Sequence, residues 1–396
     1  MRIGHYETNV HAQGGAQTYL RRLGQAQADR GHTVVYFSHV APPSEDALSP
    51  HVHVADAADL FRQAEDLHLD VLHLHRPVES LPDDPIPTVR TMHNHNGSCI
   101  SGSRLLRRTE TPCNRDVHPL GCLWGHLVDR CGPRDPRRMW DNVQTLRTEC
   151  QQSDAVPTVA VSAFLRERMI TTGHDPDQIH VIHSPAPPPL EEASPPPTDG
   201  PPRFLFLGRL VPEKGIRWLL DATAQTEVPL HIDVAGDGPL WDDLQNKKTS
   251  YGLDDRVTVH GWCEHDTVAD LMAQARAVVV PSIWHEPAGL VTLEAAAAGR
   301  AVIASRVGGM PEYAHPSFAR LVAPNDTTAL AQALTDLATD ADRARQMGDN
   351  GLQRVRSVHT MDRFIERLHA VYADAMGTAP DAAPVTAASP SSCHAS

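Results

Sequence analysis

The sequence of 396 residues contains no apolar run near the ~20 residues that a membrane-spanning helix requires. Its amino terminus, MRIGHYETNV, lacks the apolar segment of a signal peptide. Basic residues are also in deficit, because 35 lysines and arginines stand against 49 acidic residues and give a formal charge of −14. This charge disfavours nucleic acid as a partner and leaves any anionic ligand to a local basic cluster. We expect a cytoplasmic protein with at most peripheral membrane contact.

Cysteine is scarce, and the Cys-x-x-Cys pairs that would strongly indicate zinc are absent. Four of the seven cysteines lie in one loop-like, arginine-containing segment over residues 94–139, at Cys99, Cys113, Cys122 and Cys131. In a chain without a signal peptide, such cysteines favour a metal or free thiols over disulfides. Both interpretations stay open, namely a structural zinc site and buried free thiols.

The pattern of strands and helices predicts two domains, and 41% apolar residues supply enough core for both. The chain begins with a strand, a glycine turn, a helix and a second strand over residues 2–38, and further short strands follow over 70–75 and 87–94. A strand and a helix over 157–170 have Ser162 as the expected N-cap. Alternating strands and helices predict a parallel, doubly wound sheet for residues 1–185.

A proline-rich linker over residues 186–202 separates this domain from a second doubly wound unit over 203–355. We expect a C-terminal helix over 356–376 that crosses back to the first domain. The small, polar residues 377–396 predict a disordered tail. Two such domains form a cleft at the carboxyl ends of their strands, where open α/β sheets bind ligands.

The segment AVVVPSIWHEPAGLVTLEAAAAG predicts a strand, a loop with Glu286, and a helix that starts near Pro287 and runs to Gly299. The first amides of this helix would form an anion site, and they belong to Ala288, Gly289, Leu290 and Val291. Glu294 would reach toward the same helix end, because helical side chains lean toward the amino terminus. A carboxylate beside a phosphate could accept hydrogen bonds from hydroxyl groups that flank the phosphate, such as those of the ribose and the hexose in a nucleotide sugar. The alternative is that Glu286 only caps the helix and that Glu294 is a solvated helical side chain.

Arg209 and Lys214, in FLGRLVPEKG, follow a predicted strand end and could bind phosphate oxygens, although surface charge is the alternative. The segments GRLVPEKG, VAGDGP, VTVHGW, PSIWHEPAGLVTLEAAAAGRAVIAS and VGGMPE occur here in order. They resemble the retaining glycosyltransferases of family 4, which have the GT-B fold. In the first domain, GGAQTYL and TMHN resemble the glycine loop and the strand-end histidine of that family.

The resemblance implies roles for particular residues. Arg209 and Lys214 would bind the diphosphate of a UDP- or GDP-sugar donor. Glu294 would bind the ribose, and Glu286 the hydroxyls of the transferred sugar. The remaining implied contacts are Gly14 and Gly15 with the diphosphate, His93 beside the sugar, Trp262 near the base, and the amides of Gly308 and Gly309 with the sugar. For His93, Trp262 and the two later glycines, the alternatives are a satisfied histidine, a core ring and a plain turn.

The expected chemistry requires no cofactor and no divalent metal. A pair of carboxylates placed as acid and base is not evident, and the Asp340–Asp342 pair lies in a polar, helix-like region that reads as a solvated face. The resemblance implies retention of configuration, with the leaving phosphate oxygen assisting removal of the acceptor proton. Ala288 replaces the aromatic residue usual after Glu-Pro in the family, which could widen the pocket.

The acceptor remains open between a glycan, a lipid-linked sugar and a small metabolite. The cysteine-rich segment follows His93 at the expected mouth of the acceptor site. Its arginines, Arg104, Arg107 and Arg108, either meet an anionic acceptor or are solvated loop charges. The alternatives to a glycosyltransferase are a GT-B sugar phosphorylase, a nucleotide-sugar epimerase and a non-catalytic binding homologue. The last would be expected to lose Arg209, Lys214 or Glu286, and all three are present.

Overall fold

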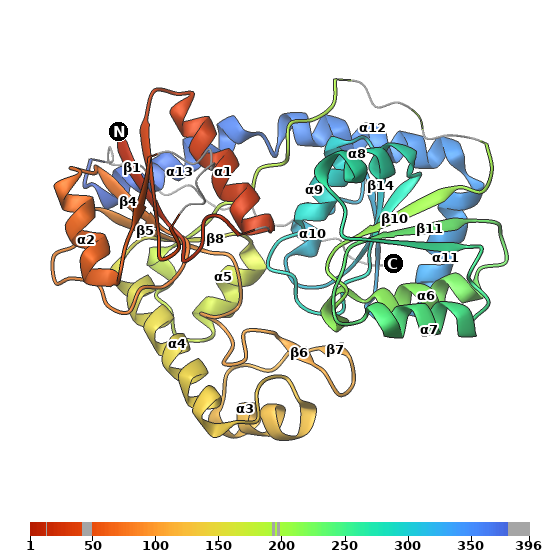
Figure 1. Cartoon of the computed structure of the whole chain (residues 1–396), viewed down its shortest axis with the longest axis horizontal. Helices are drawn as coiled ribbons and strands as arrows, with labels where there is room; N and C mark the ends of the chain where they lie inside the picture. Colours follow the sequence, from red (N-terminus) through yellow and green to blue (C-terminus); the bar gives the residue numbers. More distant parts are fainter. Residues whose placement is uncertain (13, 42–49, 192–194, 196–198, 379–396) are drawn as a thin grey trace, which may run out of the picture.

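A computed structural model describes the chain except for residues 13, 42–49, 192–194, 196–198 and 379–396. The polypeptide forms two α/β domains that lie side by side, with a smaller lobe below them (Figure 1). The tail predicted to be disordered lies outside the described residues beyond residue 378. Within the part of the chain that is described, no helix combines the length and apolarity needed to cross a bilayer.

The first domain is built on a seven-stranded, wholly parallel sheet with the order β3-β2-β1-β4-β5-β8-β9. Its strands are β1 (Arg2–Tyr6), β2 (Thr33–Ser38), β3 (His51–His53), β4 (Val71–Leu74), β5 (Thr88–Met92), β8 (Thr158–Ala160) and β9 (Ile179–Val181). The helices around it are α1 (Gly15–Ala28), α2 (Ala57–Asp66), α5 (Ala163–Ile170) and the short η2 (Pro176–Gln178). The side chain of Ser162 caps α5 by accepting a hydrogen bond from the Leu165 amide, as predicted.

The second domain has a six-stranded parallel sheet with the order β12-β11-β10-β13-β14-β15. Its strands are β10 (Arg203–Leu207), β11 (His231–Ala235), β12 (Val257–Gly261), β13 (Ala277–Val280), β14 (Ala301–Ser305) and β15 (Ala319–Val322). Its helices are η3 (Pro212–Lys214), α6 (Ile216–Gln225), α7 (Trp241–Ser250), α8 (His265–Gln274), α9 (Leu290–Ala297), α10 (Met310–Tyr313), α11 (Thr327–Thr339) and α12 (Ala341–Ser357).

Both faces of the second sheet are buried, which explains why its strands read as continuous apolar runs. Along β10, Phe204 and Phe206 enter one apolar cluster, and Leu205 enters the cluster on the opposite face. This alternation follows from the two-residue period of a strand. The two helical layers therefore fix the sheet from both sides.

The last helix, α13 (Met361–Ala375), packs against α1 and β5 of the first domain (Figure 1). Leu368 and Tyr372 of α13 are fully buried in the cluster that contains Ile3 and Leu23. The helix predicted over 356–376 is interrupted, because residues 356 and 357 end α12 and the Thr360 hydroxyl caps α13. Part of the first domain's core therefore comes from the carboxyl-terminal end of the described chain.

The lobe over residues 94–139 projects from the first domain but contacts both domains. Its elements are β6 (Leu105–Leu106), β7 (Thr111–Pro112), α3 (Pro119–Trp124) and the π-helix η1 (Gly125–Asp129), followed by α4 (Pro136–Ala155). Arg107 of the lobe pairs with Glu213 of the second domain at 2.7 Å, and Glu110 pairs with Arg217 at 2.7 Å. Leu105 is buried in the second domain's apolar cluster.

A hydrogen-bonded clamp also joins the domains. The Glu312 carboxylate accepts hydrogen bonds from the amides of Ala163, at 2.7 Å, and Phe164, at 2.9 Å, at the start of α5. The hydroxyl of Tyr313 donates to the Val161 carbonyl at 2.6 Å. A carboxylate at a helix amino terminus is stabilised by the unpaired amides and the helix dipole. The clamp therefore sets how the two carboxyl-terminal sheet edges face one another.

Truncating Leu368 to alanine should lower the free energy of unfolding by about 2–5 kcal/mol, because the side chain is fully buried. Urea unfolding measures the loss, and Glu366→Ala on the exposed face of α13 is the control. Hydrogen exchange should accelerate in β1 and β5. Acceleration confined to the second domain would contradict the placement of α13.

Candidate active site

A cavity of about 440 Å³ lies between the domains at the carboxyl ends of β10, β11 and β12. The first domain contributes the glycine loop and the start of α1 to its lining, and the second contributes strand-end loops and the start of α9. The lining includes Gly14, Gly15, Arg22, Arg209, Trp262, Leu290 and Glu294. All of these except Arg22 are site residues predicted from the sequence. The structure thus brings six predicted residues around one cavity.

The amino-terminal ends of α1 and α9 both border this cavity. A Cβ atom built at Gly15 would lie 3.7 Å from Leu290 Cδ1, so the two helix ends approach closely. The helix predicted to start near Pro287 instead begins at Leu290, because Gly289 has a non-helical backbone and acts as the N-cap. The amides of Leu290 and Val291 are therefore the first in the helix, and those of Ala288 and Gly289 precede it.

Glu294 lies in the cavity with its carboxyl group partly buried. Burial raises the pKa of this carboxyl to about 7, and the nearby positive charge of Arg22 acts in the opposite direction. Arg22 is not among the residues predicted from the sequence, although GGAQTYLRR places two arginines on the helix that follows the glycine loop. Arg22 also donates a hydrogen bond to the Ala186 carbonyl at the start of the linker.

Arg209 follows β10 and is exposed, and its guanidinium donates to no protein acceptor within the described part of the chain. Trp262 is 60% exposed at the cavity, so its alternative interpretation as a core residue is wrong. Both side chains are free to meet a ligand that enters from solvent.

Lys214 and Glu286 form an ion pair next to the cavity and do not line it. The Lys214 ammonium lies 2.6 Å from Glu286 Oε1, and the Ser282 hydroxyl donates to the same oxygen at 2.6 Å. Glu286 is 6% exposed, and the Lys214 ammonium compensates the charge of its buried carboxylate. A Cβ atom on Gly208, which does line the cavity, would lie 4.0 Å from Lys214 Cγ.

Two glycines hold the loop of Glu286. Gly308 has a φ of +56°, and a Cβ there would lie 2.4 Å from the Glu286 carbonyl oxygen. The Gly309 amide donates to that same carbonyl at 2.7 Å. The expectation that Gly309 offers its amide to a sugar is therefore wrong, because the loop already uses it.

His93 lies at the end of a hydrogen-bonded chain of imidazoles. Its Nε2 is 3.1 Å from His75 Nδ1, and His75 Nε2 is 3.1 Å from His5 Nδ1. His5 Nε2 in turn lies 2.7 Å from the Gln27 side-chain oxygen, which can only accept. A neutral His5 must therefore carry its proton on Nε2, and its Nδ1 accepts from His75 Nε2. His75 Nδ1 in turn accepts from His93 Nε2, so the Nδ1 of His93 is unprotonated and can accept a hydrogen bond. Burial lowers the pKa of His93 to about 3, which keeps the ring neutral.

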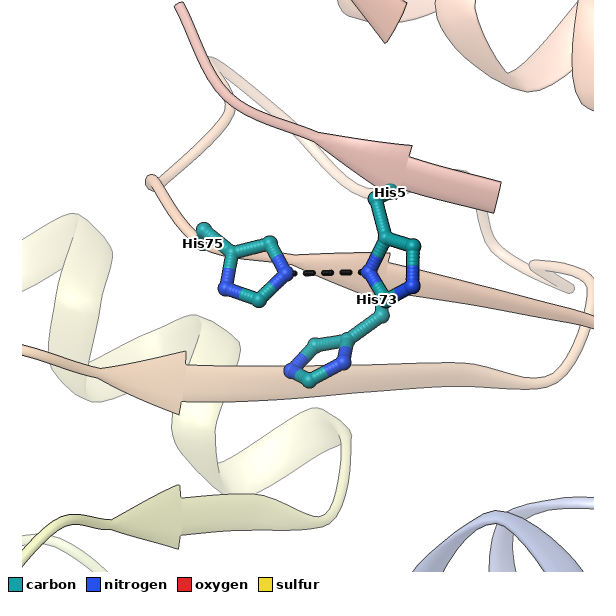
Figure 2. Close-up of side chains that lie close together, drawn as sticks. All are labelled: His5, His73 and His75. Atoms are coloured by element: carbon teal, nitrogen blue, oxygen red, sulfur yellow. Dashed lines mark hydrogen bonds between the residues drawn. The ribbon is translucent and has the colours of Figure 1, made fainter. Parts of the chain in front are cut away.

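Among the described residues, one group of three side chains has metal-ligand atoms within 4.8 Å of one another, namely His5, His73 and His75. Figure 2 shows these rings close together, with His5 on β1, His73 on β4 and His75 directly after β4, and with His5 hydrogen-bonded to His75. His73 is hydrogen-bonded through Nδ1 to the Tyr372 hydroxyl at 2.7 Å and through Nε2 to Thr91 Oγ1 at 2.6 Å. Every ring nitrogen of the three thus has a partner, so the group is a hydrogen-bond network and not a preformed metal site.

The four cysteines for which the sequence left a structural zinc site and free thiols both open lie apart from this cleft, around a small cavity in the lobe. Cys99, Cys113, Cys122 and Cys131 are free thiols in the structure. Metal binding there is not tested by these contacts.

Two parallel sheets that face one cavity, with helix amino termini and cationic side chains around it, define a two-domain nucleotide-binding enzyme. Residues 190–354 match the family described as glycosyl transferases group 1, and residues 13–188 match glycosyltransferase family 4. The uncharacterized glycosyltransferase YqgM of Bacillus subtilis is 30% identical over 68% of this chain and 73% of its own length. The chain therefore belongs to the group 1 glycosyltransferases, and its donor is a nucleotide sugar.

Other relatives agree over nearly the whole chain. MMP α-(1→4)-mannosyltransferase of Mycolicibacterium hassiacum is 25% identical, over 94% of this chain and 97% of its own length. The sucrose-phosphate synthase of Thermosynechococcus elongatus has a similar fold, with a TM-score of 0.72 at 20% identity over 96% of this chain and all of the other. Anabaena HepE in complex with UDP-glucose gives a TM-score of 0.69 at 17% identity, over 94% and 100%. These structures identify the fold as GT-B.

Replacing Glu294 by glutamine should stabilise the protein at pH 8 and have little effect near pH 4.5. The folded-state pKa is about 7 against a reference of 4.5, so the folded state binds more protons than the unfolded state between these values. Wild-type stability then falls as pH rises through this window, by about 3 kcal/mol at most. Urea unfolding at several pH values tests this, with exposed Glu366→Gln as control. A difference that is independent of pH would contradict it.

Proposed function

We propose that this enzyme transfers a hexose from a nucleoside diphosphate sugar to an acceptor hydroxyl with retention of anomeric configuration. The observation that carries the proposal is the interdomain cavity, where the glycine loop of α1 faces Arg209, Glu294 and the start of α9. Two helix ends and an unpaired guanidinium create positive potential in a protein whose net charge is −14. Such a space suits a diphosphate.

Arg209 and Lys214 are proposed to stabilise the charge that develops on the leaving diphosphate. Arg209 has no competing acceptor in the described structure, whereas Lys214 is held by Glu286 at 2.6 Å. A phosphate oxygen near Lys214 would share its ammonium with Glu286, and the Glu286 carboxylate could then accept a hydrogen bond from a sugar hydroxyl. Fixed donors aimed at a developing charge are typically worth ~2.7–4 kcal/mol each.

Glu294 is proposed to accept hydrogen bonds from the ribose hydroxyls, beside the amides of Leu290 and Val291. Trp262 is proposed to lie near the base because it is exposed at the cavity. The complexes of HepE with UDP and with UDP-glucose favour a UDP-sugar, and a GDP-sugar is the alternative. The cytoplasmic location predicted from the sequence stays a prediction.

His93 is proposed to accept a hydrogen bond from the transferred sugar through Nδ1, the nitrogen that the imidazole chain leaves unprotonated. Its ring meets that of Tyr19, which lines the cavity, at a centroid distance of 5.1 Å. Proton removal from the acceptor is assigned to the leaving phosphate oxygen, consistent with retention. The acceptor would enter from the side of the first domain and the lobe, and it is a glycan, a lipid-linked sugar or a small metabolite.

Arg209→Ala and Lys214→Ala should each lower kcat/KM at least tenfold, because each removes a cation from the leaving group. Donor turnover with a panel of UDP- and GDP-sugars is the assay, and exposed Arg320→Ala on β15 is the matched control. Since Lys214→Ala also leaves Glu286 buried without its partner, urea unfolding of each variant is measured beside turnover, which separates lost folding from lost catalysis. Near-normal turnover in both single variants would refute the diphosphate assignment.

Calorimetry with free nucleoside diphosphate should separate the two glutamates. Glu294→Ala should weaken binding of the diphosphate, and Glu286→Ala should leave that binding intact while it lowers sugar transfer. The opposite pattern would reverse the two roles. Product analysis also separates the alternatives, because a phosphorylase would require inorganic phosphate and an epimerase would convert the donor without any acceptor.

A further inference from the structure

The lobe contains a second, smaller cavity of about 30 Å³, whose size suits a single ion or water. Four thiols and one imidazole line this cavity: Cys99, Cys113, Cys122, His126 and Cys131. Asp116 also lines it, but its carboxylate pairs with Arg168 at 3.1 Å. The thiols and the imidazole lie within residues 99–131, and the β6–β7 hairpin, α3 and η1 bring them to one cavity. Cys150 and Cys263 are also free thiols but do not line the cavity, so they offer an internal comparison.

His126 is oriented as metal-binding histidines usually are. The side chain is 1% exposed, and its Nδ1–H donates to the Pro133 carbonyl at 2.8 Å. Its Nε2 is buried and has no hydrogen-bond partner. A histidine that ligates a metal commonly donates its other ring N–H to a carbonyl in this way. A buried lone pair without a partner is costly unless a ligand satisfies it.

Arg104 places a buried positive charge beside the same thiols. It is 2% exposed, and its guanidinium donates to backbone carbonyls, including that of Ser98 at 2.8 Å. No carboxylate within the described residues forms an ion pair with it, and its Nε lacks a partner. A divalent metal held by four thiolates carries a net charge of −2. Such a complex would supply the countercharge that Arg104 lacks.

The lobe also has little apolar core of its own. Leu120, Leu123, Trp124 and Leu127 are 44–73% exposed, and the buried Leu105 packs into the second domain. Its two strands have two residues each. Segments with so little core usually depend on a disulfide or a metal for stability. The cysteines are unpaired here, so a metal is the remaining cross-link.

We propose that this cavity binds one structural zinc ion through Cys99, Cys113, Cys122 and Cys131, with His126 Nε2 available as an alternative fourth ligand. Thiolate and imidazole donors favour zinc over hard cations. No three of these ligand atoms lie within 4.8 Å of one another in the described structure, so the metal would draw them inward. Binding would release the thiol protons and fix the hairpin whose Arg107 and Glu110 contact the second domain. The site is independent of the transfer chemistry proposed above.

Purified full-length protein should contain about one zinc per chain by elemental analysis. Protein stripped of metal and titrated with cobalt(II) should develop the absorption bands of tetrahedral cobalt thiolate, and zinc should remove them. Absence of metal together with absence of cobalt bands would overturn the proposal. Mass spectrometry under non-reducing conditions that finds these cysteines in disulfides would also overturn it.

Single serine variants of Cys99 and Cys122 should lose at least tenfold in zinc affinity, whereas Cys150→Ser and Cys263→Ser should retain full metal content. His126→Ala reports whether the imidazole is a ligand, through a shift in the cobalt spectrum. Chelation should increase hydrogen exchange in the lobe while binding of free UDP at the cleft persists. Equal zinc affinity in the lobe and control variants would place the metal elsewhere and refute the assignment.

Discussion

The carboxyl ends of two parallel sheets face one cavity, and this geometric constraint determines where each candidate residue can lie. Gly14 follows β1, His93 follows β5, Arg209 follows β10 and Glu286 follows β13. These positions are far apart in sequence, yet parallel strands bring their ends to one edge. The Glu312 carboxylate then ties the second domain to the start of α5, so the two edges have a defined separation.

The electrostatics of the cleft follow from this arrangement. The helix ends at α1 and α9 supply partial positive charge without desolvating a full cation. The three cationic side chains at the cleft differ in their surroundings. Lys214 is compensated by Glu286, Arg22 lies near a carboxyl whose pKa is raised by burial, and Arg209 is exposed. Affinity for an anion therefore depends on a few groups, while the surface as a whole is acidic.

Sequence patterns predicted the fold because both sheets are parallel and buried on both faces, which produces apolar runs separated by glycine turns. The order of the family segments indicated Arg209 and Glu294 correctly as neighbours of one cavity. Predictions from local sequence rules were wrong where contacts between distant segments determine the local structure. Pro287 suits a helix start, but the helix begins at Leu290, and the Gly309 amide is used by the Glu286 loop.

Other features had no periodic signal to reveal them. The imidazole chain joins His5, His75 and His93 across three strands, and only strand order shows that they meet. The lobe's contacts with the second domain likewise depend on domain orientation, since Arg107 and Glu213 are separated by 106 positions. In both cases the relevant distance is spatial, and a single sequence carries no direct record of it.

The return of α13 to the first domain also affects the order in which the protein can mature on the ribosome. Synthesis proceeds from the amino terminus, and domains generally fold as units during it. Here the first sheet emerges early, but the buried side chains of Phe364, Leu368 and Tyr372 that cover it emerge only about 180 residues after Val181, the end of its last strand. Until then, the nascent first domain exposes an apolar surface that a chaperone could shield. The second domain can complete its own core before the first, so the domain made first is finished last.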